Sequence, residues 1–127
     1  MKNEQLFGFE ELEIWKKSRI FKQQVAELVK GFPGDERFRL SDQLIRSSRS
    51  TNSLIAEGHG RYTYADQIHF CIQARGSLAE SFNHLVDAYD AAYISEESLH
   101  QFRIQLKEIE RMLNGYIHHL RKQKENT

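Results

Sequence analysis

The chain has 127 residues, with 18 Lys and Arg, 18 Asp and Glu, one Pro and one Cys. This length predicts one domain over residues 1–127, and the zero net charge removes the simplest argument for a nucleic-acid or membrane partner, which would be a large basic excess. Cys71 has no second cysteine to pair with, which is typical of the reducing cytoplasm. Met1–Glu4 and the residues after it contain no apolar run that predicts a signal peptide or a membrane span.

Three breaks divide the chain into four predicted helices. The breaks are Gly31–Asp35, Gly58–Gly60 and Ile94–Glu96, and the helices are expected at about 10–30, 41–57, 63–93 and 96–122. Helices joined by short connections pack antiparallel. The sequence therefore predicts an all-α fold, an up-down-up-down four-helix bundle with left-handed packing, with loose tails before about Phe9 and after about Lys122.

The first two helices differ in how clearly the sequence encodes them. The first has a regular apolar line and a stop at Gly31; the line is Ile14, Ser18, Phe21, Val25, Leu28 and Phe32. The second is expected to begin with Ser41 as its N-cap and to bury Leu44, Ser48, Thr51 and Ile55. Its Ser47–Ser53 stretch has poor helix propensity, so a loop is the alternative. We favour a helix whose hydroxyls bond back by one turn and whose small side chains allow a close helix contact.

The last two helices have clearer starts. Thr63 followed by Asp66 has the pattern of a capping box. The third helix then has a wide apolar face made by Tyr64, Ile68, Cys71, Ala74, Leu78, Phe82, Leu85, Ala88, Tyr89 and Ala92. The fourth follows Ser95, with Glu96 and Glu97 in its first turn. Its apolar line has the 3.5-residue period of a left-handed bundle: Leu99, Phe102, Leu106, Ile109, Leu113, Tyr116 and Leu120.

Four sequence blocks resemble one protein family. They are Phe9-x-x-Leu12-x-x-Trp15-Lys16, then Phe32-Pro33 with Glu36, Leu40 and Gln43, then Ile55-Ala56-Glu57-Gly58, and finally Ala74-Arg75-Gly76-Ser77-Leu78-Ala79-Glu80. In this order they are similar to the four-helix-bundle proteins named for open reading frames in 23S rRNA intervening sequences, over about residues 7–121. A related branch comprises the accessory proteins of diversity-generating retroelements, basic pentamers that work with a reverse transcriptase and nucleic acid.

The resemblance implies a four-helix bundle that assembles as a homopentamer, with no established enzyme activity. The residues it marks as a structural family motif are Trp15, Pro33, Gln43, Glu57, Gly58, Arg75, Gly76, Ser77 and Glu80. This chain departs from the family where it has Leu54 in place of an Asn and lacks a nearby Pro, so no role of that Asn is transferred. Its neutral charge also departs from the basic retroelement branch.

The charges are segregated along the chain. Residues 62–97 carry one base and six acids, and residues 98–127 carry six bases and three acids. Basic residues on the second and fourth helices could contact nucleic-acid phosphates, the candidates being Arg46, Arg49, Arg103, Lys107, Arg111, Arg121 and Lys122. The alternatives are a solvated face or ion pairs with the acidic third helix of a neighbouring subunit.

The remaining polar residues are interpreted as structural. Arg75 is expected to pair with Glu57 or Glu80, with Gly76 allowing a close helix approach, and Glu80 with His84 is an ordinary helical ion pair. Glu97 with His100, and Asp66 with His69, only partly match a di-iron pattern, so no metal is predicted. Cys71 lies on the apolar line without an evident base. No nucleotide-binding or catalytic motif is present, so an enzyme is not expected.

The sequence therefore predicts a cytoplasmic, non-enzymatic protein without a cofactor that forms a ring of identical subunits. Repetition around a ring strengthens weak contacts by avidity. We expect weak binding of RNA, a ribosomal particle or a reverse transcriptase, and no membrane contact. The alternative is a protein-binding or structural scaffold without nucleic acid.

Overall fold

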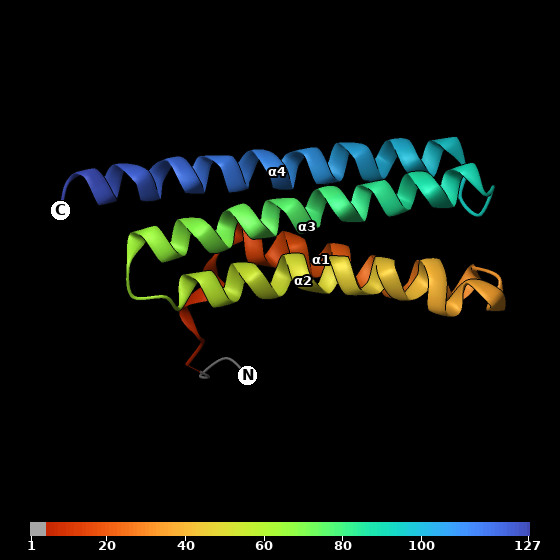
Figure 1. Ribbon diagram of the computed structural model, residues 1–127, viewed down its shortest axis with the longest axis horizontal. Coiled ribbons are helices and arrows are strands. Elements are labelled where there is room, and N and C mark those ends of the chain that lie inside the picture. The colour runs from red at the N-terminus through yellow and green to blue at the C-terminus, as the bar shows by residue number, and fades with distance from the viewer. Residues whose placement is uncertain (1–4) are drawn as a thin grey trace.

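Four helices lie along one common long axis (Figure 1). The computed structural model describes residues 5–127, and its helices are α1 (Glu13–Leu28), α2 (Asp42–His59), α3 (Tyr64–Asp90) and α4 (Glu96–Glu125). α2 packs between α1 and α3, α3 packs on α4, and α4 also contacts α1. The predicted all-α, up-down four-helix fold is confirmed. No helix in this part of the chain combines the length and the apolarity that crossing a bilayer requires.

The connection between α1 and α2 is itself helical, and this corrects one predicted helix start. It contains η2 (Val29–Gly31), η3 (Gly34–Glu36) and the π-helical η4 (Arg37–Ser41). The prediction that Ser41 caps α2 is wrong, because its backbone is already helical (φ −59°, ψ −50°) and its hydroxyl makes no capping hydrogen bond. Gly31 ends a helical run as expected, but without a positive φ.

α3 begins at its predicted cap, and a serine side chain caps the start of α4. The Thr63 hydroxyl accepts a hydrogen bond from the Asp66 N–H at 3.1 Å, and the Ser95 hydroxyl accepts one from the Ser98 N–H at 3.0 Å. α4 continues to Glu125, so the chain after Lys122 is not a loose tail. Before α1, the chain forms a short 3-10 helix, η1 (Gly8–Glu11), and residues 1–4 lie outside the described part.

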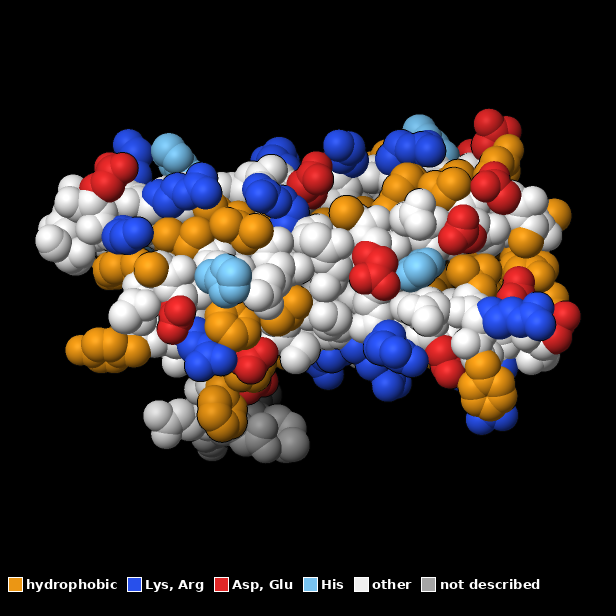
Figure 2. Space-filling view, viewed as in Figure 1, with side chains coloured by type: hydrophobic (Ala, Val, Ile, Leu, Met, Phe, Trp, Pro, Cys, Tyr) orange, Lys and Arg blue, Asp and Glu red, His pale blue; other side chains and the backbone are white. Residues whose placement is uncertain are grey.

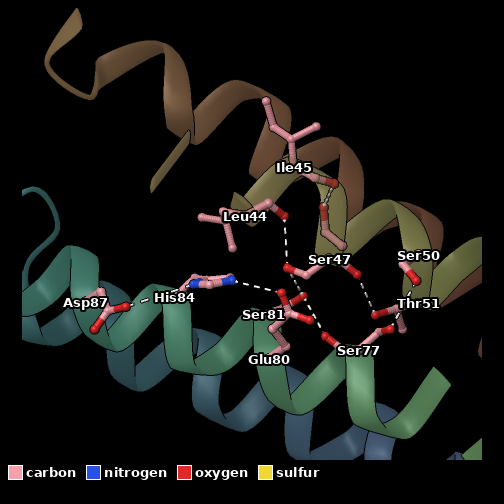
Figure 3. A network of polar contacts seen from close by, with 11 residues as sticks. Leu44, Ile45, Ser47, Ser50, Thr51, Ser77, Glu80, Ser81, His84 and Asp87 are labelled. Carbon is pink, nitrogen blue, oxygen red and sulfur yellow. Dashed lines mark hydrogen bonds and ion pairs between the residues drawn. The ribbon is translucent and has the colours of Figure 1, made fainter. Parts of the chain in front are cut away.

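The serine-rich segment of α2 is helical, as predicted, because its hydroxyls satisfy the backbone of their own helix. Ser48 Oγ donates to the Ile45 carbonyl at 3.0 Å, and Thr51 Oγ1 donates to the Ser47 carbonyl at 3.0 Å. Ser81 Oγ of α3 donates to Ser47 Oγ at 2.8 Å, so a buried hydroxyl pair joins the two helices (Figure 3). The contact between α2 and α3 is the most extensive in the bundle.

A glycine determines how closely α2 and α3 approach at their other end. A Cβ atom on Gly58 would lie 2.7 Å from the Phe70 Cβ, closer than side-chain carbons tolerate. A Cβ on Gly76 would meet nothing within 4 Å, so the expectation that Gly76 allows a close helix approach is wrong. Gly76 is exposed on the outer face of α3.

The core follows the predicted apolar lines with small shifts. On α4 the buried line passes through Ile117, while Tyr116 is half-buried, because a straight helix of 3.6 residues per turn drifts away from a 3.5-residue repeat. On α3 Ser81 is fully buried, whereas Tyr89 is 37% exposed. Ala92 lies beyond the end of α3 and is exposed. The buried face of α3 is therefore narrower than the sequence predicted.

Candidate nucleic-acid interface

The predicted basic stripe on α4 lies along an exposed edge of the bundle. Arg103, Lys107 and Arg111 are one turn apart and exposed, and Figure 2 shows Lys and Arg side chains recurring along the edge that α4 forms. The Arg103 guanidinium lies over the Phe82 ring of α3, 5.2 Å from its centre. Lys107 Nζ is 3.3 Å from Glu110 Oε1. The stripe therefore faces the seam between α3 and α4.

A shallow groove runs beside this stripe. Its volume is about 220 Å³, its lining is mostly apolar, and Arg103, Lys107 and Glu110 are its charged residues. The other lining residues are Leu78, Ala79, Phe82 and Leu106. Such a surface can hold a flat apolar group, such as a nucleobase or an apolar side chain, while the bases contact a phosphate or a carboxylate.

Arg46 and Arg49 are exposed on α2 and are remote from the α4 stripe. Arg49 is close enough to Lys22 of α1 to lower its pKa, whereas Arg103 lies over Phe82 of α3. Arg49 and Arg103 thus lie at different seams of the bundle, α1–α2 and α3–α4. The structure does not bring the seven predicted residues into one surface.

The α1–α2 seam contains two bases that the sequence analysis did not select, Arg19 and Lys22. They are three residues apart on α1, and Lys22 Nζ donates to Asn52 Oδ1 of α2 at 2.6 Å. Partial burial lowers the pKa of Lys22, and the positive charges of Arg19 and Arg49 lower it further. The signal available in the sequence was the spacing of Arg19 and Lys22 beside the buried line at Ser18 and Phe21.

The C-terminal bases extend the α4 edge beyond the bundle body. Arg121 and Lys122 are exposed in the last turns of α4, where cations favour the negative end of the helix dipole. Figure 1 shows the end of α4 projecting past the neighbouring helix α3. These two residues are therefore accessible to a large partner.

The family-motif residues make structural contacts, with one correction. Glu80 pairs with His84 as predicted, with Oε2 3.1 Å from Nε2. Arg75 pairs with neither predicted carboxylate: its Nη1 donates to Asn114 Oδ1 of α4 at 2.8 Å, while Glu57 lies 3.7 Å from Arg61. Arg75 therefore has a neutral partner on the neighbouring helix instead of a carboxylate.

Three other motif positions make hydrogen bonds within the bundle. The Trp15 carbonyl accepts hydrogen bonds from Ser18 Oγ and Asn52 Nδ2, and Ser77 Oγ is 3.1 Å from Ser50 Oγ. The Pro33 carbonyl accepts from the Glu36 N–H at 3.0 Å, so it begins the helical connection. Gln43 is exposed beside this connection.

The titratable side chains of residues 5–127 do not assemble a reactive centre. No three His, Cys, Asp or Glu side chains in this range come together as metal ligands. Burial raises the pKa of the Cys71 thiol to about 11. Burial also raises the pKa of Tyr116, with a smaller contribution from Cys71.

Residues 10–115 match the profile of a family described as 23S rRNA-intervening sequence protein. The fold is similar to a solved structure from Bacteroides thetaiotaomicron VPI-5482, described as a protein of unknown function from the S23 ribosomal protein family. The two chains are 25% identical with a TM-score of 0.76, and the match covers 82% of this chain and 94% of that one. No curated protein matches the sequence.

Proposed function

Because this chain belongs to the 23S rRNA-intervening sequence protein family, we propose that it is a non-enzymatic, cytoplasmic homo-oligomer that binds RNA weakly through repeated basic surfaces. A ring of five subunits is the assembly that we infer from the family resemblance. Its RNA would be free or part of a ribosomal particle or a reverse-transcriptase complex.

The observation that carries the RNA proposal is the lack of counter-charges at the predicted bases. Among residues 5–127, Lys107 is the one member of the predicted set with a carboxylate within 4 Å. The six members without such a carboxylate are Arg46, Arg49, Arg103, Arg111, Arg121 and Lys122. Other surface lysines, such as Lys16, Lys17 and Lys30, each pair with a glutamate. Unpaired bases are available to displace counterions from phosphates.

The oligomer proposal is supported by exposed apolar residues on α3 and α4. Ile104 is 54% exposed on α4 and Ile72 is 36% exposed on α3, and neither lines the groove beside the basic stripe. A contact between copies through these two side chains would leave Arg103 and Lys107 accessible, and each copy would add its basic edge to the ring. Weak contacts repeated around the ring would then bind one RNA with useful avidity.

The test compares two triple variants. We expect Arg103→Gln, Lys107→Gln and Arg111→Gln together to weaken binding of a single-stranded RNA by about tenfold or more, measured by fluorescence anisotropy at low salt. Lys16→Gln, Lys17→Gln and Lys30→Gln remove the same charge from paired positions and should change the affinity by less than about twofold. Both variants should sediment as the unmodified protein does.

Two outcomes would contradict the proposal. Equal loss of RNA binding in both triple variants would mean that total charge alone is responsible. A monomer at micromolar concentration in sedimentation velocity would remove the ring.

A protein-binding or structural scaffold is the second candidate. It is favoured by the charge balance of −5 in residues 62–97, because the basic rim of the α3–α4 groove could pair with the acidic face of α3 in the next subunit. In that case the α4 triple variant would dissociate the oligomer, and the unmodified protein would retain no RNA in filter binding at low salt.

A further inference from the structure

Three bases without counter-charges meet at the seam between α1 and α2. Arg19 and Lys22 are three residues apart on α1, and Arg49 lies three residues before Asn52 on α2. Residues at this spacing share a helix face, with Cβ atoms about 5–6 Å apart. The hydrogen bond between Lys22 Nζ and Asn52 Oδ1, 2.6 Å long, brings the two faces together. Within residues 5–127 none of these bases has a carboxylate within 4 Å.

Buried neighbours fix the position of the lysine. Asn52 is 3% exposed, and its Nδ2 donates to the Trp15 carbonyl at 3.1 Å and to Ser18 Oγ at 2.8 Å. These two bonds turn the amide oxygen of Asn52 toward Lys22. The ammonium group is therefore held at the seam and loses little freedom when a ligand binds.

An aromatic ring fixes the position of Arg19. The Arg19 guanidinium lies over the Trp15 ring, 5.6 Å from its centre, and Trp15 makes an edge contact with Phe9 at 5.1 Å between ring centres. Stacking on tryptophan leaves the N–H donors at the edge of the guanidinium free for an anion.

This arrangement of like charges costs the folded state some stability. The pKa of Lys22 is lowered by partial burial and by Arg19 and Arg49, so the folded protein binds this proton less tightly than the unfolded chain does. The contribution of Lys22 to stability is therefore unfavourable at neutral pH, and it improves only as the pH rises through the lowered pKa toward 10.5. A neutral donor could make the same bond to Asn52, so the helix contact alone does not explain the charge.

We propose that Arg19, Lys22 and Arg49 form a binding site for one phosphate group. Two guanidinium groups and an ammonium supply the donors that phosphate oxygens bind most strongly, and the anion would neutralise the repulsion among the three bases. The phosphate belongs either to a nucleic-acid backbone or to a small phosphate compound. The site goes beyond the proposed function and shares Arg49 alone with the predicted RNA-binding set, so the two proposals can fail separately.

The test titrates the full chain with inorganic phosphate against sodium chloride at equal ionic strength, followed by NMR chemical shifts and by the melting temperature. We expect saturable shifts at α1 and α2 and a higher melting temperature in phosphate. Lys22→Gln should weaken phosphate binding by about tenfold or more, because a charge-assisted contact is lost. Lys17→Gln makes the same change on α1 beside Glu108 of α4 and should leave the affinity within about twofold.

Three results would overturn the proposal: shifts that do not saturate, equal loss in the two variants, or a Lys22→Gln variant that is destabilised equally with and without phosphate, as a merely structural lysine would be. A second titration with a short RNA identifies the source of the phosphate. Competition between the RNA and inorganic phosphate, lost in Lys22→Gln, assigns the site to the backbone. Phosphate binding that the RNA does not displace assigns it to a small compound.

Discussion

Ala92 has the backbone conformation that glycine adopts most easily. Its φ is 64°, and it follows α3 in a Schellman-type end, where the Tyr93 N–H donates to the Ala88 carbonyl at 2.8 Å and the Ala92 N–H donates to the Tyr89 carbonyl at 2.9 Å. A Cβ atom makes this left-handed conformation unfavourable by about 1–2 kcal/mol per residue. The alanine is therefore strained, and the strain is confined to the turn between α3 and α4.

Replacing this alanine with glycine should stabilise the protein. We expect Ala92→Gly to raise the free energy of unfolding by about 0.5–1 kcal/mol, since relief of the strain exceeds the entropy that glycine adds to the unfolded chain. Ala91→Gly is the control: its φ is −83°, so only the entropic cost remains and stability should fall. Urea denaturation measures both. A destabilised Ala92→Gly variant would show that the left-handed backbone is not maintained in solution.

Cys71 should be unreactive while the protein is folded. Burial raises its pKa to about 11, so at pH 8 few molecules carry the thiolate that reacts with iodoacetamide. We expect labelling at least about 100-fold slower than in denaturant, with the rate rising toward pH 11. Because the unfolded thiol ionises at a lower pH than the folded one, the free energy of unfolding should decline as the pH rises from about 8.5 to about 11. Rapid labelling of the folded protein at pH 8 would contradict this burial.

At the scale of helices, a matched pair of glycines tests the α2–α3 contact. Gly58→Ala should lower the free energy of unfolding by about 1–3 kcal/mol, because its Cβ would lie 2.7 Å from the Phe70 Cβ. On α4, the Cβ atom added by Gly115→Ala would have no neighbour within 4 Å. This variant should raise the free energy of unfolding by about 0.5–1 kcal/mol, because alanine has the higher helix propensity. Thermal and urea denaturation compare the two. A stabilising Gly58→Ala would mean that the two helices can separate without cost.

The helices themselves could be predicted from the sequence, because hydrophobic periodicity and side-chain caps are local signals. Thr63 and Ser95 cap their helices through residues three positions away, and the hydroxyls of α2 bond within their own helix. The errors have two causes. Ser41 does not cap α2 because the residues directly before it are already helical. Arg75 bonds to Asn114 on another helix, 39 positions away, a contact that no local pattern predicts.

The candidate site was predictable only in part, for the second of these reasons. The α4 stripe is a local pattern on one helix and is exposed as expected. The cluster at the α1–α2 seam depends on Lys22 meeting Asn52, 30 positions away, and helix spacing alone does not give that register. Arg49 was selected, but its neighbours Arg19 and Lys22 were not.

At the scale of the whole molecule, the zero net charge conceals two separate basic seams. Lys22 meets Asn52 at the α1–α2 seam and Arg103 lies over Phe82 at the α3–α4 seam, so the candidate bases within residues 5–127 do not form one continuous surface. α3 is the acidic helix, with four acids against the single base Arg75, and Glu80 and Asp87 flank His84 on it (Figure 3). If both proposed sites bind phosphate, the subunit does so without a strong overall field, which favours weak, repeated contacts over steering at long range.

Salt dependence separates binding by these edges from association of the subunits. Counterion release predicts that RNA affinity falls linearly on a log–log plot as salt rises from about 50 to about 500 mM, with a slope of about −0.7 per phosphate contact on a single strand. The sedimentation coefficient of the oligomer should stay constant over that range, because an apolar contact through residues such as Ile104 is not screened. Replacing Arg103, Lys107 and Arg111 with Gln should make the RNA slope shallower by up to about two per subunit engaged. An oligomer that dissociates as salt rises, with or without RNA, would instead mean that the basic edge of one subunit pairs with the acidic α3 of the next, and the scaffold would replace the RNA-binding ring.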